Sequence, residues 1–280
     1  MPALSLPALE VAERLGRLRP LMAEAGVDAL MVTSLFNVRY LTGFTGSAGT
    51  VVVYPEDAVL VTDGRYATQS AEQLSAAGVD ARIEIVTGPG QKDLMISLVP
   101  PGTRLGLEAA HVSWARQRVF ATEWYAGCEL VPTTGLVEGL RRVKDPGERA
   151  RVARAAAIAD RALGNVFSLL EEGPTEAAFA LALDTEMRRL GADEPSFDTI
   201  VAAGPNSAKP HHHPSERVIG RGEPVVIDFG ARVDGYCSDM TRTVSVGELD
   251  DPELRRVYGV VAASQAAGVA AVRAGVRGAD

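Results

Sequence analysis

Two aspartates in the second half of the chain have the residue type and the spacing of a metal site. Asp228 and Asp239 lie eleven residues apart on two segments, Val225–Gly230 and Tyr236–Thr243, that flank a short turn. This arrangement predicts an antiparallel hairpin, in which residues that face each other across the strands are close neighbours. Carboxylates are hard ligands that chelate or bridge divalent cations.

The turn between the two segments leaves two registers open. A longer turn places Asp228 directly opposite Asp239. A two-residue turn on Asp234-Gly235 instead places Asp228 opposite Thr241, with the two aspartates on a diagonal of the same face. Either register therefore brings the two carboxylates together on one side of the hairpin.

Adjacent carboxylates on a buried hairpin need compensation for their charge. Asp228 follows three β-branched residues, which indicates a mostly buried strand, and uncompensated burial of two like charges is unfavourable. One divalent cation, or a pair of them, removes the conflict. The alternative is that one or both aspartates face solvent or form ion pairs with Arg232 or Arg242. The residues alone leave both explanations open.

Three adjacent histidines form a second candidate feature. His211, His212 and His213 follow the loop Gly204-Pro205-Asn206-Ser207. The simpler interpretation is a polar loop. The functional hypothesis is that one of them points into the site as a proton donor or as a partner of an oxyanion. Three adjacent histidines of an extended loop cannot all converge on one ion.

The elements that position these residues lie in the part of the chain after Gly135, which is expected to contain both helices and strands. Asp145, followed by Pro146 and Glu148, is expected to cap the first helix. The expected helices run from there to about Glu171, from a Thr175 cap to about Leu190 and from an Asp251 cap to about Arg273, and the expected strands cover Thr199–Ala203, Pro224–Phe229 and Tyr236–Val246.

The first 135 residues alternate β-branched runs with helical periods, which predicts an α/β domain with a mixed sheet. The turn at Pro55-Glu56-Asp57 predicts a hairpin between two of the strands. The expected helices cover Glu10–Ala25, Arg65–Ala77 and Lys92–Leu98, and the expected strands cover Asp28–Thr33, Thr50–Tyr54, Ala58–Thr62 and Ala81–Thr87.

Composition excludes several classes of protein. The net charge of −8, from 36 acidic and 28 basic residues, argues against a nucleic-acid binder, which needs a basic face. No run of about 18 apolar residues and no signal-peptide pattern is present, so we expect a cytoplasmic protein without a membrane partner. Two cysteines are too few for a disulfide framework.

Longer motifs give these residues a context. The run Ser196–His211, together with Val225–Gly230 and Gly235–Thr243, resembles the Xaa-Pro peptidase family of aminopeptidase P and prolidase. Upstream, Asn37–Phe44 and Asp63–Tyr66 are similar to the creatinase/prolidase N-terminal domain of that family. The resemblance implies a creatinase/prolidase-type domain over residues 1–135 and a pita-bread metallopeptidase domain of α+β type over residues 136–280, with mainly its first half present.

The resemblance also implies a reaction and its residues. Asp228 would chelate one metal and Asp239 would bridge two divalent ions, usually Mn, Co or Zn, while Thr241 would lie behind these ligands. His211 corresponds to the family histidine that contacts the substrate and helps to stabilise the tetrahedral intermediate. The implied activity is hydrolysis of Xaa-Pro bonds in proline-containing peptides by a metal-bridging hydroxide, in a homodimer.

The remaining ligands of that family are not found in this sequence. The family completes its site with a histidine and two glutamates beyond the first two aspartates. The 41 residues after Asp239 contain no histidine, and their glutamates, Glu248 and Glu253, have no matching motif. We therefore expect the 280-residue chain to be a fragment or truncated product that is inactive alone, since three of five metal ligands are missing.

Three functions are compatible with the motifs. The first is a dinuclear Xaa-Pro peptidase. The second is a non-catalytic pita-bread protein used for binding, or an inactive fragment of the enzyme. The presence of Asp228, Asp239 and His211 favours an enzyme, because a binding module has no need of opposed buried carboxylates. The third is a creatinase-type C–N hydrolase, which works without metal and would not call for the two aspartates.

Overall fold

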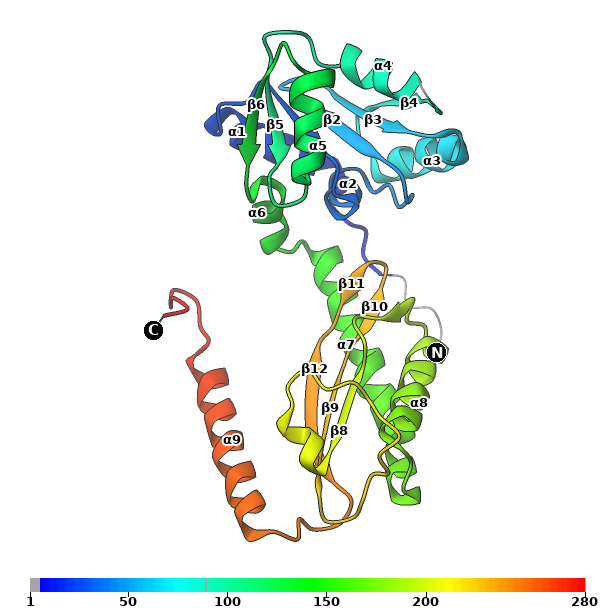
Figure 1. Ribbon diagram of the computed structural model, residues 1–280, viewed down its shortest axis with the longest axis vertical. Coiled ribbons are helices and arrows are strands. Elements are labelled where there is room, and N and C mark those ends of the chain that lie inside the picture. Colours follow the sequence, from blue (N-terminus) through cyan, green and yellow to red (C-terminus); the bar gives the residue numbers. More distant parts are fainter. Residues whose placement is uncertain (1–5, 89, 280) are drawn as a thin grey trace. The chain divides into compact units, whose positions relative to one another are not determined.

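The structure, a computed structural model, describes residues 6–88 and 90–279. It consists of two compact units, Met1–Gly147 and Glu148–Asp280, which are coloured blue to green and green to red in Figure 1. Each unit has its own sheet or sheets and its own helices, and each is described separately below.

The first unit is built on a six-stranded mixed sheet in the order β4-β3-β2-β1-β5-β6. The pairs β1–β2 and β2–β3 are antiparallel, and the remaining pairs are parallel. The hairpin expected at Pro55-Glu56-Asp57 is confirmed as β2–β3. The strands are β1 (Ala29–Val32), β2 (Thr50–Val53), β3 (Ala58–Thr62), β4 (Arg82–Ile85), β5 (Arg104–Glu108) and β6 (Glu129–Thr133).

Helices cover both faces of this sheet because its strands are apolar on both sides. Leu30 and Val32 of β1 join one apolar cluster, while Ala29 and Met31 join another on the opposite face. The first cluster receives side chains from α1 (Arg14–Glu24), α2 (Leu35–Thr42), α3 (Ala67–Ala77) and α6 (Leu136–Arg142), and the second from α4 (Gly90–Ser97) and from the helical segment formed by α5 (Trp114–Val119) and η3 (Phe120–Trp124).

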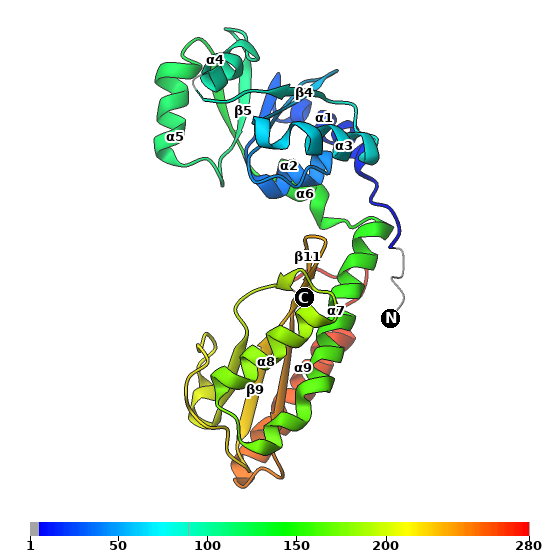
Figure 2. The ribbon, with the colours of Figure 1, turned by 90° about the vertical axis from the view of Figure 1, so that its right-hand side faces the viewer.

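The second unit contains two three-stranded antiparallel sheets, in the orders β11-β10-β7 and β12-β9-β8. Figure 2 shows α7 and α8 side by side on one face of the sheet that contains β9. The elements are α7 (Pro146–Val166), η4 (Phe167–Glu172), α8 (Glu176–Arg189), β7 (Glu194–Pro195), β8 (Ile200–Ala203), η5 (Gly204–Ala208), β9 (Pro224–Phe229), β10 (Ala231–Val233), β11 (Tyr236–Cys237), β12 (Met240–Ser245) and α9 (Pro252–Ala271).

Local signals in this unit agree with the structure at most places. The Thr175 hydroxyl accepts a hydrogen bond of 3.1 Å from the backbone of Ala178, and the Asp251 carboxylate accepts one of 2.8 Å from Glu253, so the caps expected at these two residues are confirmed. The cap expected at Asp145 stays a prediction. The single strand expected over Tyr236–Val246 is wrong in one respect: the ladder is interrupted at Ser238 and Asp239, between β11 and β12.

The last helix, α9, differs from the others in its surroundings. All of its residues are exposed, including Val260 at 57% and Val261 at 61%. In the part of the chain that the structure describes, no helix is long and apolar enough to cross a membrane.

Candidate active site

The turn of the hairpin decides how the two aspartates face each other. Asp234 and Gly235 both have positive φ, 48° and 78°, as a two-residue turn of type I′ requires. Val233 therefore pairs with Tyr236, and Thr241 pairs with Asp228. The register with Asp228 directly opposite Asp239 is wrong, because the Asp-Gly pair adopts the tighter turn that matches the twist of the strands.

The tip of the hairpin is anchored to α7. The Arg151 guanidinium lies 2.5 Å from a carboxylate oxygen of Asp234, and the Tyr236 hydroxyl donates a hydrogen bond of 3.0 Å to Glu148. These contacts link the turn to the beginning of α7 and hold the register of the strands that follow.

Asp228 lies on the half-buried face of β9. Along this strand Val225, Ile227 and Phe229 are buried, whereas Asp228 and its alternate neighbours are only partly covered. The Thr241 hydroxyl donates a hydrogen bond of 2.8 Å to Oδ1 of Asp228, across the ladder. Asp228 is thus less buried than its β-branched neighbours suggested, and one of its oxygens is oriented by the facing threonine.

Asp239 lies in the interruption between β11 and β12 and is exposed. The register is the same on both sides of the interruption, so Asp239 falls opposite Gly230 and shares a face with Asp228 on a diagonal. No side chain among residues 6–88 and 90–279 is hydrogen-bonded to its carboxylate. Both candidate ligands therefore have oxygens that remain accessible on one face.

A close backbone approach holds this interruption in place. The hydroxyl of Ser238 accepts a hydrogen bond of 3.0 Å from the backbone of Ala231, and the backbone of Ser238 donates one of 2.9 Å to the Ala231 carbonyl. A Cβ atom on Gly230 would lie only 2.0 Å from the carbonyl oxygen of Ser238. Glycine at this position allows the segment that carries Asp239 to pass next to β9.

The alternative to a metal is that the aspartates face solvent or form ion pairs; exposure to solvent holds for Asp239, whereas the two arginines form their ion pairs elsewhere. Arg242 lies 3.3 Å from Asp160, and Arg232 pairs with Glu194. The donor set of Asp228 and Asp239 is two carboxylates with accessible oxygens, which is the chemistry that hard divalent cations select. Within the described residues, no group of three or more His, Cys, Asp or Glu side chains is arranged to hold a metal ion.

The three histidines have different environments. His211 and His213 are exposed, whereas the side chain of His212 is only 10% exposed. Nε2 of His212 lies 2.8 Å from Oε2 of Glu176, the first residue of α8. The assignment of His211 to the substrate stays a prediction. Sequence reasoning missed Glu176, although its place directly after the Thr175 cap marked it as a first-turn acidic residue.

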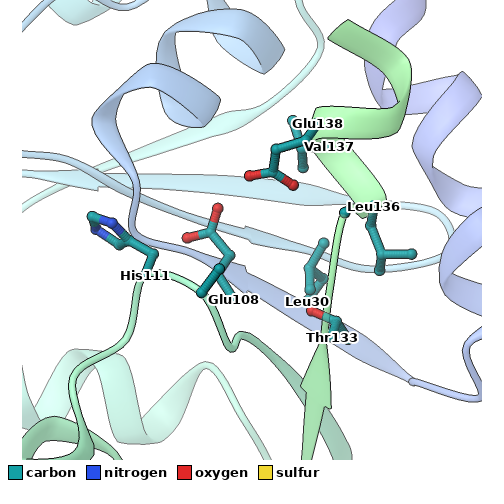
Figure 3. Close-up of a pocket in the computed structure, with 9 residues that line it drawn as sticks. Leu30, Glu108, His111, Thr133, Leu136, Val137 and Glu138 are labelled. Atoms are coloured by element: carbon teal, nitrogen blue, oxygen red, sulfur yellow. The ribbon is translucent and has the colours of Figure 1, made fainter. Parts of the chain in front are cut away.

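The first unit contains a pocket with two facing carboxylates, Glu108 and Glu138 (Figure 3). Nδ2 of Asn37 donates to both, at 2.7 Å and 2.6 Å. Glu108 also accepts backbone hydrogen bonds from Thr33 and Ser34, of 2.6 Å and 2.8 Å. These contacts join α2 to the ends of β1 and β5, so the pair has a structural role.

Comparison with known proteins agrees with this architecture. Residues 14–143 match the creatinase/prolidase N-terminal domain, and residues 150–280 match the metallopeptidase family M24. The chain is 38% identical over 270 residues to the uncharacterized peptidase YqhT of Bacillus subtilis, covering 95% of this chain and 74% of that one.

Solved structures give the same result. An Xaa-Pro dipeptidase from Bacillus anthracis has a TM-score of 0.87 at 36% identity, over 94% of this chain and 73% of that chain. An X-Pro aminopeptidase from Thermotoga maritima has a TM-score of 0.78 at 31% identity, over 89% of this chain and 70% of that chain.

The expected fold is confirmed: an α/β domain with a mixed sheet, followed by part of a pita-bread domain. The chain belongs to the Xaa-Pro peptidases of metallopeptidase family M24 and spans about three quarters of the length of these relatives.

Proposed function

We propose that the protein hydrolyses Xaa-Pro bonds in peptides with the help of two divalent metal ions, as an aminopeptidase P or an Xaa-Pro dipeptidase. The observation that carries the proposal is the placement of Asp228 on β9 and of Asp239 directly before β12, on a diagonal of one face, in a chain of the M24 family. A non-catalytic role would not require two adjacent carboxylates with accessible oxygens.

Asp228 and Asp239 would hold the metal ions, with Mn, Co or Zn as the candidates. Asp228 would hold one ion and Asp239 would be shared by both, while the Thr241 hydroxyl donates a hydrogen bond of 2.8 Å to Oδ1 of Asp228 and orients it. Metal ions bound there would lower the pKa of water and polarise the scissile carbonyl group. The family resemblance supports completion of the set by a histidine and two glutamates.

His211 would act on the substrate. Its side chain is exposed on the loop after η5, so its imidazole is available to a peptide. A ring N–H directed at the scissile carbonyl would stabilise the negative charge that develops on that oxygen in the tetrahedral intermediate. We also assign residues 1–135 to a creatinase/prolidase-type N-terminal domain and residues 136–280 to the catalytic metallopeptidase domain.

The substitution Asp239→Asn tests the proposal in the protein that carries the complete ligand set. It should abolish Mn²⁺ binding and turnover of both an Xaa-Pro dipeptide and an Xaa-Pro-Yaa tripeptide, because an amide neither bridges nor neutralises two cations. Far-UV circular dichroism should be unchanged, since Asp239 is exposed.

The matched control is Asp193→Asn, at another exposed aspartate of the same unit, and this variant should retain binding and activity. The relative rates on the two substrates distinguish a dipeptidase from an aminopeptidase. Wild-type activity in the Asp239→Asn variant would show that the ligand assignment is wrong.

A further inference from the structure

The buried carboxylate of Glu176 accepts five hydrogen bonds. Its side chain is fully buried at the first turn of α8. Oε1 accepts hydrogen bonds from the backbone of Ala203 at 2.8 Å and from Asn206 at 3.0 Å. Oε2 accepts hydrogen bonds from His212 at 2.8 Å and from Ser215, whose backbone and hydroxyl lie at 3.0 Å and 2.6 Å.

All five donors belong to one segment of chain, residues 203–215. The backbone of α8 adds two further links to the same region: Ala177 donates to the Ser215 carbonyl at 3.0 Å, and Glu176 donates to the Arg217 carbonyl at 3.0 Å. The loop with the three histidines is therefore folded around a single buried carboxylate. Because hydrogen bonds to a charged group are about twice as strong as neutral ones, this carboxylate is a strong contributor to the stability of the loop conformation.

The protonation state of Glu176 fixes the role of His212. Burial by itself raises the pKa of the Glu176 carboxyl group, but the hydrogen bonds from Ala203, Ser215, Asn206 and His212 outweigh it and lower the pKa to about 2. The ionised carboxylate only accepts hydrogen bonds, so Nε2 of His212 must carry the hydrogen. His212 is thus a donor that faces inward, between two exposed histidines.

We propose that Glu176 and His212 form a positioning pair, which holds the 203–215 loop in the conformation that presents His211 to the substrate. With His212 turned toward Glu176, His211 is left on the outside of the loop. The part of this proposal that concerns catalysis rests on the proposed function, whereas the part that concerns the loop does not.

The test compares His212→Ala, which removes the donor, with His212→Gln, whose side-chain amide can donate to Glu176 from a similar position. His213→Ala is the matched control, because His213 is exposed on the same loop. Hydrogen exchange of the Ser215 amide, which donates to Glu176, reports on the loop without any need for activity. We expect roughly tenfold or faster exchange in His212→Ala and near wild-type exchange in His212→Gln and His213→Ala.

Kinetics on an Xaa-Pro dipeptide give the second readout, in the protein with the complete ligand set. His212→Ala should lower kcat roughly tenfold to a hundredfold with a smaller change in KM, because a misplaced catalytic group affects the transition state most. His212→Gln should restore most of the loss. Absence of activity in the wild-type protein would refute the proposed function but leave the exchange result decisive for the pair. Unchanged Ser215 exchange in His212→Ala, or no restoration by His212→Gln, would overturn the positioning pair.

Discussion

Among the polar contacts of the first unit, we expect loss of the ion pair between Arg14 and Asp145 to lower its thermal stability most. Its two side chains are only 2% and 4% exposed, and Nη2 of Arg14 lies 2.8 Å from Oδ2 of Asp145. The same guanidinium donates a hydrogen bond of 2.8 Å to the Tyr40 carbonyl and stacks 4.0 Å from the centre of the Tyr40 ring. The backbone of Glu10 also donates to Asp145, at 3.1 Å.

The perturbation is Asp145→Asn, which removes the negative charge but preserves the shape of the side chain. Loss of one partner of a buried ion pair lowers the free energy of unfolding by about 3–5 kcal/mol. We expect the lower end, about 3 kcal/mol, because Arg14 keeps its contacts with Tyr40. For a unit of this size, each kcal/mol shifts the thermal midpoint by about 3 °C, so the expected decrease is about 10 °C.

Tryptophan fluorescence measures this unit specifically, because both tryptophans of the chain, Trp114 and Trp124, belong to it. The control is Asp28→Asn, which breaks the ion pair between Asp28 and Arg104, 2.6 Å apart. The side chains of Arg104 and Asp28 are 48% and 46% exposed. Solvent screens such a pair, so the control should hardly change the midpoint. Equal shifts in the two variants would refute the argument that burial makes the Arg14–Asp145 pair important.

Two further outcomes are expected. Gly230→Ala should weaken Mn²⁺ binding roughly tenfold or more in a calorimetric titration, because the new Cβ displaces the backbone next to Asp239. The control Gly259→Ala should leave binding unchanged, because no heavy atom lies within 4 Å of the Cβ that it adds. The polypeptide of residues 1–280 should bind at most about one divalent ion weakly and show no Xaa-Pro hydrolysis, because two carboxylates are too few for a tight dinuclear site. Elemental analysis that finds two tightly held metal ions would mean that other residues, for example from a partner chain, supply ligands.

Local features of the sequence were sufficient for much of the fold and for part of the site. The caps at Thr175 and Asp251 and the turn at Asp234-Gly235 depend on residues next to each other in the chain, and the structure has all three. The common face of Asp228 and Asp239 follows from strand alternation in either register, so it could be predicted before the register was known.

Segments with weaker signals escaped prediction. The helix Leu35–Thr42 was missed although it starts after Ser34 and ends at Gly43, which has φ 75°. At eight residues it is too short for a clear helical period, and its stability comes from packing against the sheet. The strands Arg104–Glu108 and Glu129–Thr133 were missed because short strands interrupted by glycine or proline carry little periodicity.

Only the tertiary structure decided which polar side chains meet. Arg14 and Asp145 are 131 residues apart, and Glu176 and His212 are 36 residues apart. No local pattern distinguishes His212 from the histidines beside it, because the choice depends on a buried carboxylate delivered by a separate helix. The sequence by itself determined the residue types and the local geometry, whereas burial of charge by distant segments determined the partners, since a charge leaves water only where other parts of the chain supply its hydrogen bonds.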